Sequence, residues 1–259
     1  MENVYLALII IVMAGLGILA LLIITLRRKH ENPSRRRQRK GGIATLKSDR
    51  EESDRYSKQI AQTIMKANKV FIFTLDSFME GNPLHMKEAF LMNENLNRST
   101  RKQKNTILPF LSTMKKRDVD AGHFYAQVID YQREISHSLH SLQVPLQVIL
   151  EEVPHPFPEE EGKEIRTMVS GVEAFFNFAL HIVKEQRFEE LEELVGLKAR
   201  IIQILHDIEM ARFHKENDFS TEQTHSLLMK ALNETRTLLV HAVSLVKAYR
   251  NFILVNREL

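Results

Sequence analysis

Apolar side chains recur at intervals of three and four residues, almost without interruption, from residue 51 to the C-terminus. This is the repeat of an amphipathic α-helix, whose apolar stripe must be buried against other helices. The chain of 259 residues contains only nine Gly and seven Pro, about half the usual share. So few turn-forming residues exclude a β sandwich, barrel or propeller, which need a turn every 8–12 residues or so. The predicted fold class is therefore all-α.

The periodicity divides this region into six helices. They are expected over residues 54–79, 84–116, 118–142, 160–186 and 188–214, with a last helix that starts at Ser220. Gly81 and Pro83 are expected to end the first helix, and Pro109 to kink the second near its end. Ser220, followed three residues later by Gln223, resembles a capping box at the start of the last helix.

Two apolar stripes illustrate the predicted core. The first helix carries Tyr56, Ile60, Ile64, Phe71, Leu75 and Phe78. The third carries Phe124, Val128, Tyr131, Ile135, Leu139 and Leu142. A loop rich in acid and proline follows, with Pro145, Pro154, Pro156 and Pro158. The sequence thus predicts two antiparallel sets of three helices, joined across this loop.

An uncharged apolar run of 23 residues, Val4–Leu26, precedes the helical region. As a helix it is about 34 Å long, enough to cross a hydrocarbon core of about 30 Å. A secretory signal peptide is the competing interpretation, but its basic residues would precede a shorter apolar run and a cleavage site would follow. Here the basic residues follow the run, which favours a retained transmembrane helix.

The residues after this run form a strongly basic collar. Residues 27–50 hold ten Lys and Arg against Glu31 and Asp49, a net charge of +8 in a chain whose total is +3. The predicted membrane-surface residues are Arg27, Arg28, Lys29, Arg35, Arg36 and Arg37. By the positive-inside rule the collar lies in the cytoplasm. The rest of the chain is mildly acidic, so no nucleic-acid partner is expected.

The domain organisation predicted from this charge pattern has four parts. They are an extracytoplasmic N-terminus (1–3), a transmembrane helix (4–26), a basic juxtamembrane linker (27–53) and a cytosolic helical domain (54–258). Pro33, Gly41 and Gly42 favour a flexible linker.

The third helix carries a polar stripe beside its core face. Its members are Asp120, His123, Gln127, Asp130, Glu134 and His137. Asp130 and Glu134 lie one turn apart, a spacing at which two carboxylates can share a hard cation. His123 or His137 would add a nitrogen ligand for a transition metal. The other interpretation is a solvated polar face, which any helix in a bundle needs.

Catalytic motifs are absent from the sequence. There is no Cys, and no Gly-rich phosphate loop, nucleophile elbow or HExxH is present. The segment Ile135–Leu139, followed by Pro145, is similar to the phosphoacceptor helix of sensor histidine kinases. Such a kinase needs a nucleotide-binding domain with Gly-rich loops, and after residue 143 only the isolated Gly162, Gly171 and Gly196 occur. The chain is therefore predicted not to be an enzyme.

Two stretches carry a family resemblance: Asp120–Glu134, preceded by Ile107–Leu111, and Leu232–Ile253. They resemble the C-terminal cytosolic PhoU-like region attached to some bacterial inorganic phosphate transporters. The resemblance covers roughly residues 55–255, with the same order and the same two-by-three helix plan. It implies a six-helix PhoU-like bundle, preceded here by the single transmembrane helix.

The resemblance also implies a metal site. PhoU-like proteins regulate phosphate uptake, and their helices often carry an acid-x-x-x-acid motif that binds metal clusters. Only Asp130 and Glu134 map onto that motif, with His123 and Asp120 as neighbours on the same face. The implied cofactor is a divalent or ferric metal ion. The second helix set has no matching acidic pair. The sequence therefore departs from the family members that bind two metal clusters.

The single predicted span limits what the chain can do. Phosphate transporters of this kind have many spans, and one helix cannot enclose a substrate site in the membrane. The expected function is a membrane-anchored PhoU-like regulatory module in the bacterial inner membrane, which modulates or senses a phosphate permease. Its expected partners are the lipid membrane and that permease. The alternative is a membrane-tethered scaffolding bundle without a ligand. Homo-oligomerisation, and truncation of a longer transporter, stay open.

Overall fold

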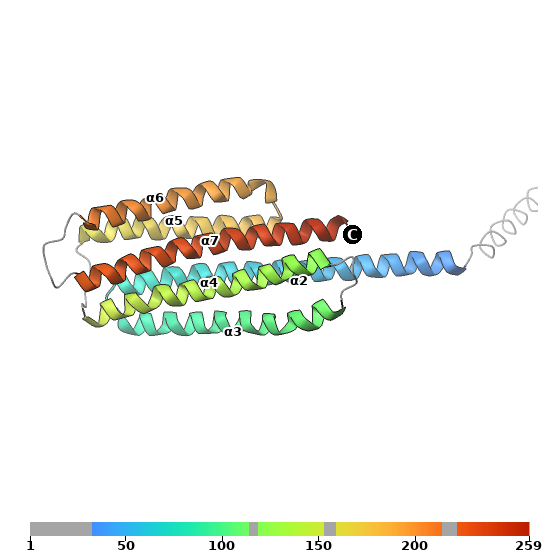
Figure 1. Cartoon of the computed structure of the whole chain (residues 1–259), viewed down its shortest axis with the longest axis horizontal. Helices are drawn as coiled ribbons and strands as arrows, with labels where there is room; N and C mark the ends of the chain where they lie inside the picture. Colours follow the sequence, from blue (N-terminus) through green and yellow to red (C-terminus); the bar gives the residue numbers. More distant parts are fainter. Residues whose placement is uncertain (1–32, 114–118, 153–158, 214–221, 259) are drawn as a thin grey trace, which may run out of the picture. The chain divides into compact units, whose positions relative to one another are not determined.

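The computed structural model of the chain describes residues 33–113, 119–152, 159–213 and 222–258. They form six α-helices and one 3₁₀ turn (Figure 1). Their bounds are α2 Pro33–Met79, α3 Pro83–Thr113, α4 Val119–Glu152, α5 Glu159–Glu185, η2 Phe188–Glu190, α6 Leu191–Phe213 and α7 Glu222–Glu258. No strand occurs in these ranges, which confirms the all-α class.

The chain divides into two compact units, Met1–Asp54 and Arg55–Leu259. The first unit contributes only the N-terminal part of α2 to the described residues, and the second contains the helical bundle. The predicted transmembrane segment Val4–Leu26 and the collar residues Arg27, Arg28 and Lys29 lie outside the described residues.

The flexibility predicted from Pro33, Gly41 and Gly42 for the juxtamembrane linker is not found from Pro33 onward. Helix α2 begins at Pro33 and continues through Gly41 and Gly42. Proline is favourable as the first residue of a helix because its missing N–H would have no partner there. Each glycine costs the helix about 1 kcal/mol relative to alanine, which weakens a long helix without ending it.

The prediction that the third helix ends at Leu142 is also wrong. Helix α4 continues through Pro145 to Glu152. A proline inside a helix costs about 3 kcal/mol or more. The additional turns bury Leu146, Ile149 and Leu150, and burial of each such side chain stabilises by about 1.5–3 kcal/mol. The apolar residues beyond the proline therefore outweigh its effect. The predicted loop residues Pro154, Pro156 and Pro158 lie outside the described residues.

Four helices form the centre of the bundle, and two lie outside it. Helices α4 and α7 are in extensive contact with each other. Helix α2 joins this centre through Tyr56, whose ring contacts Tyr125 of α4 and Phe252 of α7. It also reaches α5, because the Ser57 hydroxyl donates to the carbonyl oxygen of Val183 (3.4 Å). Helix α3 packs on α4 at one side, and α6 packs on α5 and α7 at the other (Figure 1).

The apolar stripes occupy the positions expected of them. Every predicted core residue of the first helix is buried, from Tyr56 to Phe78. On α4, Val128, Ile135, Leu139 and Leu142 are buried, whereas Phe124 and Tyr131 are only partly covered and pack against the edge of the core. Helical periodicity therefore predicted all six core residues listed for the first helix, and four of the six listed for the third.

Two tight turns connect the first two helices of each set. After α2, Gly81 adopts the left-handed conformation (φ 66°), which costs glycine no strain. Asn82 then caps α3, since its Oδ1 accepts hydrogen bonds from the backbone N–H groups of Leu84 (3.1 Å) and His85 (3.2 Å). Pro83 therefore starts α3 and does not only end α2. After α5, the left-handed position is held by Gln186 (φ 54°).

One described stretch, Ser226–Val255 of α7, is long and apolar enough to cross a membrane. Slightly more than half of its most apolar part is buried inside the bundle. A buried core helix satisfies the same criteria of length and composition, so the stretch is weak evidence for a membrane span.

Candidate functional site

The predicted polar stripe of α4 lies at the bundle surface. His123 is exposed, and its Nε2 atom lies 3.0 Å from Nε2 of Gln127. Asp130 is exposed and faces Lys104 of α3, with 3.8 Å between its Oδ1 and the lysine Nζ. Glu134 is partly buried, and its Oε1 lies 3.2 Å from Nη2 of Arg133. The side chain of Asp120 lies outside the described residues.

Three of the four predicted metal ligands, Asp130, Glu134 and His123, have described side chains, and each of them has a different partner. Among the described side chains, no group of three or more His, Asp or Glu residues is arranged to hold a metal ion. Asp130 and Glu134 each lie beside a cation, and His123 contacts a glutamine. A metal ion bound by the two carboxylates would compete with Lys104 and Arg133. Metal binding here remains a prediction.

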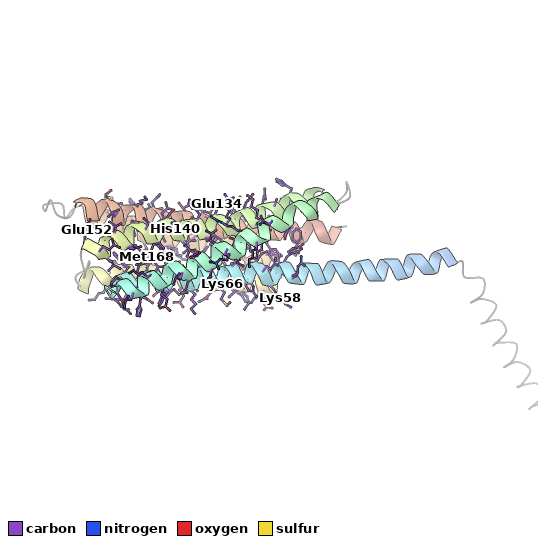
Figure 2. The ribbon with its side chains drawn as sticks, turned by 90° about the horizontal axis from the view of Figure 1, so that it is seen from below. Lys58, Lys66, Glu134, His140, Glu152 and Met168 are labelled. Carbon is purple, nitrogen blue, oxygen red and sulfur yellow. The ribbon has the colours of Figure 1, made fainter. Side chains whose placement is uncertain are left out.

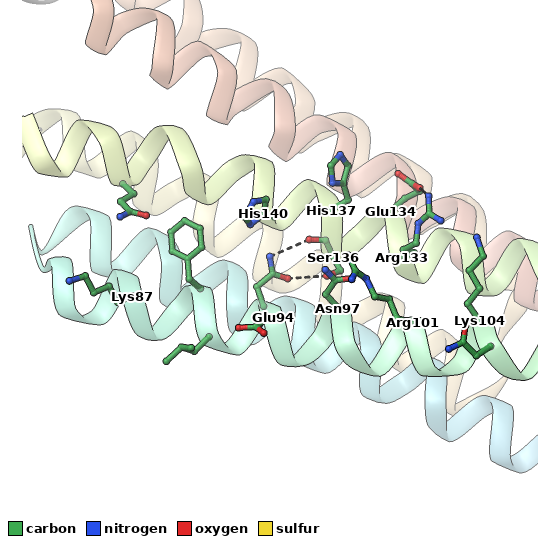
Figure 3. Close-up of a pocket in the computed structure, with 15 residues that line it drawn as sticks. Lys87, Glu94, Asn97, Arg101, Lys104, Arg133, Glu134, Ser136, His137 and His140 are labelled. Carbon is green, nitrogen blue, oxygen red and sulfur yellow. Dashed lines mark hydrogen bonds and ion pairs between the residues drawn. The ribbon is translucent and has the colours of Figure 1, made fainter.

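A groove lies between α3 and α4, next to the stripe (Figure 3). Its volume is about 1160 Å³, larger than most pockets for drug-sized ligands. Its walls carry four cationic side chains, which are Lys87, Arg101, Lys104 and Arg133. Two carboxylates, Glu94 and Glu134, and two imidazoles, His137 and His140, also line it.

The floor of the groove is a buried network of hydrogen bonds. Asn93 of α3 is 3% exposed and Ser136 of α4 is 1% exposed. The Asn93 amide donates to the Ser136 carbonyl oxygen and to Gln143 Oε1, both at 3.2 Å. The Ser136 hydroxyl donates to Asn93 Oδ1 (3.2 Å), and the Gln143 amide donates to Thr74 Oγ1 of α2 (3.0 Å). One network thus fixes the relative register of α2, α3 and α4.

A second set of titratable groups lies where α4 and α7 face each other. The ring of His241 on α7 lies 6.3 Å from the ring of Tyr131 on α4. Burial lowers the pKa of the His241 imidazole, and the charges of Glu134 and Glu234 act in the opposite direction. Desolvation has the larger effect, so this histidine is neutral at neutral pH.

Sequence reasoning missed an acidic pair at the C-terminal end of α2. Asp76 and Glu80 have the same acid-x-x-x-acid spacing as Asp130 and Glu134. Burial raises the pKa of the Asp76 carboxyl, and the nearby carboxylates Glu80 and Glu173 raise it further. The spacing alone could have identified this pair, but Glu173 comes from α5 and no local pattern connects it to them.

The cations of the groove were also missed, although a signal was present. On α3 the lining residues follow one another at three- and four-residue steps, and they include Lys87, Phe90, Glu94, Asn97, Arg101 and Lys104. Such steps define one side of a helix. Without knowledge of the facing helix, this side looks like a solvated surface, because only contact with α4 makes it the wall of a groove.

His137, which lies in the segment similar to a phosphoacceptor helix, is exposed and lines this groove. Arg35, Arg36 and Arg37 of the collar lie in the first turn and a half of α2. The arrangement as a whole defines a helical bundle with a basic groove on one face. Comparison with protein-family models and with curated protein sequences finds no match to the chain.

Proposed function

We propose that the chain is a membrane-anchored PhoU-like regulatory module of inorganic phosphate transport. It modulates or senses a phosphate permease in the bacterial inner membrane and is not itself a transport pore. In this proposal Val4–Leu26 spans the membrane, and the basic collar contacts anionic headgroups on the cytoplasmic side.

The observation that carries the proposal is the place of the two PhoU-like stretches in the bundle. Asp120–Glu134 lies in α4 and Leu232–Ile253 lies in α7, and these two helices are in extensive contact. A resemblance that arose only from amphipathic repeats would not require its two stretches to be packing partners. The two sets of three helices, with these two helices at the centre, agree with the plan of a PhoU-like bundle.

Anchoring supports a regulatory role on physical grounds. A tether converts the encounter with a membrane partner into a local event with a high effective concentration, so weak contacts suffice. The module would then respond to its permease without a large, permanent interface.

Phosphate uptake and co-purification test the proposal together. In the native bacterium, removal of the gene should change the rate of radiolabelled phosphate uptake, and the full chain should restore it. The matched control is a chain that ends after residue 53, which keeps the anchor and the collar but lacks the bundle. A tagged full chain, extracted in mild detergent, should enrich a phosphate permease relative to this control. Unchanged uptake together with no enriched permease would favour the scaffolding bundle.

Metal binding is a separate part of the proposal. Calorimetry with Fe, Mn, Zn, Mg and Ca tests it on the full chain and on a variant with Asp130→Ala and Glu134→Ala, with His123 and Asp120 as the further proposed ligands. Loss of binding in the variant would support the site. Absence of binding, or binding unchanged by the variant, would remove the metal from the proposal and leave the regulatory role to be decided by uptake.

A further inference from the structure

The groove between α3 and α4 has more positive charge than its own acids neutralise. Glu94 is paired with Arg98, at 2.9 Å, and Arg98 does not line the groove. Glu134 is paired with Arg133. Among the residues that the structure describes, Lys87 and Arg101 have no carboxylate within ion-pair distance, and the structure gives Lys104 only the long contact with Asp130.

Three of the cations gather at one end of the groove and come from both of its walls. Figure 3 shows Arg101 and Lys104 on α3 and Arg133 on the facing helix α4, whereas Lys87 lies at the far end. Like charges that face one another across a groove repel, and an anion between them converts this repulsion into attraction. The planar guanidinium groups of two arginines match the oxygens of a phosphate group.

The floor of the groove cannot supply competing ligand contacts. The amide of Asn93 and the hydroxyl of Ser136 are both used in the buried network. The donors left for a ligand are therefore those of the walls, where Asn97 and Asn105 lie beside the cations. The buried network holds α3 and α4 in register, which fixes the spacing of the two walls that carry these donors.

The other end of the groove has a different character. Phe90 of α3 and His140 of α4 form an edge-to-face pair with ring centroids 5.8 Å apart. Leu91, which is 60% exposed, lines the groove beside them. An aromatic and apolar surface next to a cationic end suits a ligand that has phosphates at one end and a flat ring at the other.

We propose that this groove binds a small anion with several phosphate groups, held by Arg101, Lys104 and Arg133. Inorganic polyphosphate and nucleoside triphosphates share this chemistry. The proposal goes beyond the regulatory function, because binding can be measured on the purified chain with no permease present.

Isothermal titration calorimetry of the full chain in a nonionic detergent tests the proposal. The probes are sodium triphosphate and ATP, each titrated at low salt, with sodium sulfate as a reference for nonspecific anion binding. The groove variant combines Arg101→Gln with Lys104→Gln. The matched control combines Lys66→Gln with Lys102→Gln, since both lysines are exposed and neither lines the groove; Figure 2 shows Lys66 on α2, apart from Glu134 and His140. Circular dichroism checks that both variants keep their helix content.

We expect triphosphate or ATP to bind more tightly than sulfate. The affinity should fall about tenfold or more in the groove variant, because two charged hydrogen-bond donors are lost, and less than about twofold in the control. Equal binding of triphosphate and ATP would support recognition of the phosphates alone. Tighter binding of ATP, reduced by Phe90→Ala, would support a nucleotide whose base lies at the aromatic end. Absence of binding by both probes, affinities no higher than that of sulfate, or equal losses in the two variants would overturn the proposal.

Discussion

The two sets of three helices are built from different interiors. Among the described residues, nine of the ten buried polar side chains belong to α2, α3 and α4. They are Thr63, Thr74, Ser77, Asn93, Thr100, Gln132, Ser136, Ser138 and Gln143. Of the described side chains in α5–α7, only Thr235 belongs to this group, and its hydroxyl donates to the carbonyl oxygen of Ala231 in its own helix (3.0 Å). Its interior is otherwise apolar, with Phe175, Phe176 and Ile182 fully buried.

This difference separates two tasks that a core can perform. Apolar contacts are strong in sum but have little directional preference, so they stabilise a fold more than they select one arrangement. Hydrogen bonds between buried side chains are directional, and an unmade one is costly. The first set, which carries the groove, thus has the interior that holds helices in one register, while the second set supplies much of the apolar burial.

The largest expected effect tests the apolar set. Replacement Phe176→Ala removes a side chain that is 0% exposed, and it should lower the free energy of unfolding by about 3–5 kcal/mol because a cavity remains. Urea unfolding of residues 51–259, followed by circular dichroism, measures it. Val240→Ala is the control, since Val240 is 44% exposed, and its effect should stay within about 0.5 kcal/mol. Similar losses for both variants would contradict the assignment of α5 to the core.

An intermediate effect is expected in the polar set. Asn93→Ala leaves the hydroxyl of Ser136 and the side-chain oxygen of Gln143 without their partner, which should cost about 2 kcal/mol. A double-mutant cycle with Ser136→Ala gives the coupling between the two side chains. We expect the double variant to lose clearly less free energy of unfolding than the sum of the two single variants. The reason is that Ser136→Ala removes the hydroxyl that Asn93→Ala leaves without a partner. Additive losses would show that the two residues do not act as one network.

The smallest effect concerns Asp76, where α2 faces α5. Its pKa is raised in the folded state above 3.8, so the folded protein binds this proton more tightly than the unfolded chain. The resulting stabilisation is present below pH 3.8 and is lost as the pH rises through the folded-state pKa. At neutral pH the charged carboxylate is therefore unfavourable, and Asp76→Asn should raise Tm.

Thermal unfolding at several pH values checks this effect. The gain in Tm from Asp76→Asn should shrink as the pH is lowered toward 3.8, because Asp76 then carries a proton in the parent protein as well. Glu88→Gln, which removes an exposed carboxylate of α3, serves as the reference for loss of one negative charge. A lower Tm for Asp76→Asn at neutral pH would contradict the predicted direction.

The sequence predicted the parts of the fold that depend on local periodicity. The six helices and the buried stripe from Tyr56 to Phe78 follow from apolar spacing alone. The errors at Pro33 and Pro145 arose where single residues were given more weight than the helices around them. At Pro33 the position within the helix makes proline harmless, and at Pro145 the apolar residues beyond it compensate for the lost hydrogen bond.

The candidate site could be predicted only in part, for a different reason. The stripe with Asp130 and Glu134 lies on one helix, so its spacing is visible in the sequence. The contact between Lys104 and Asp130, and the facing of Arg101 and Arg133 across the groove, join separate helices. No local pattern specifies which side of α3 meets which side of α4, and the charge of a groove appears only once both walls are known.

The hydrogen-bonded floor of the groove also constrains how this protein can change over generations. In the apolar set, Leu and Ile can replace one another singly at small cost. Asn93, Ser136 and Gln143 each satisfy a neighbour in the network, so a change at one position favours a compensating change at another. Among related sequences we therefore expect these three positions to vary together, while positions such as Ile182 vary independently.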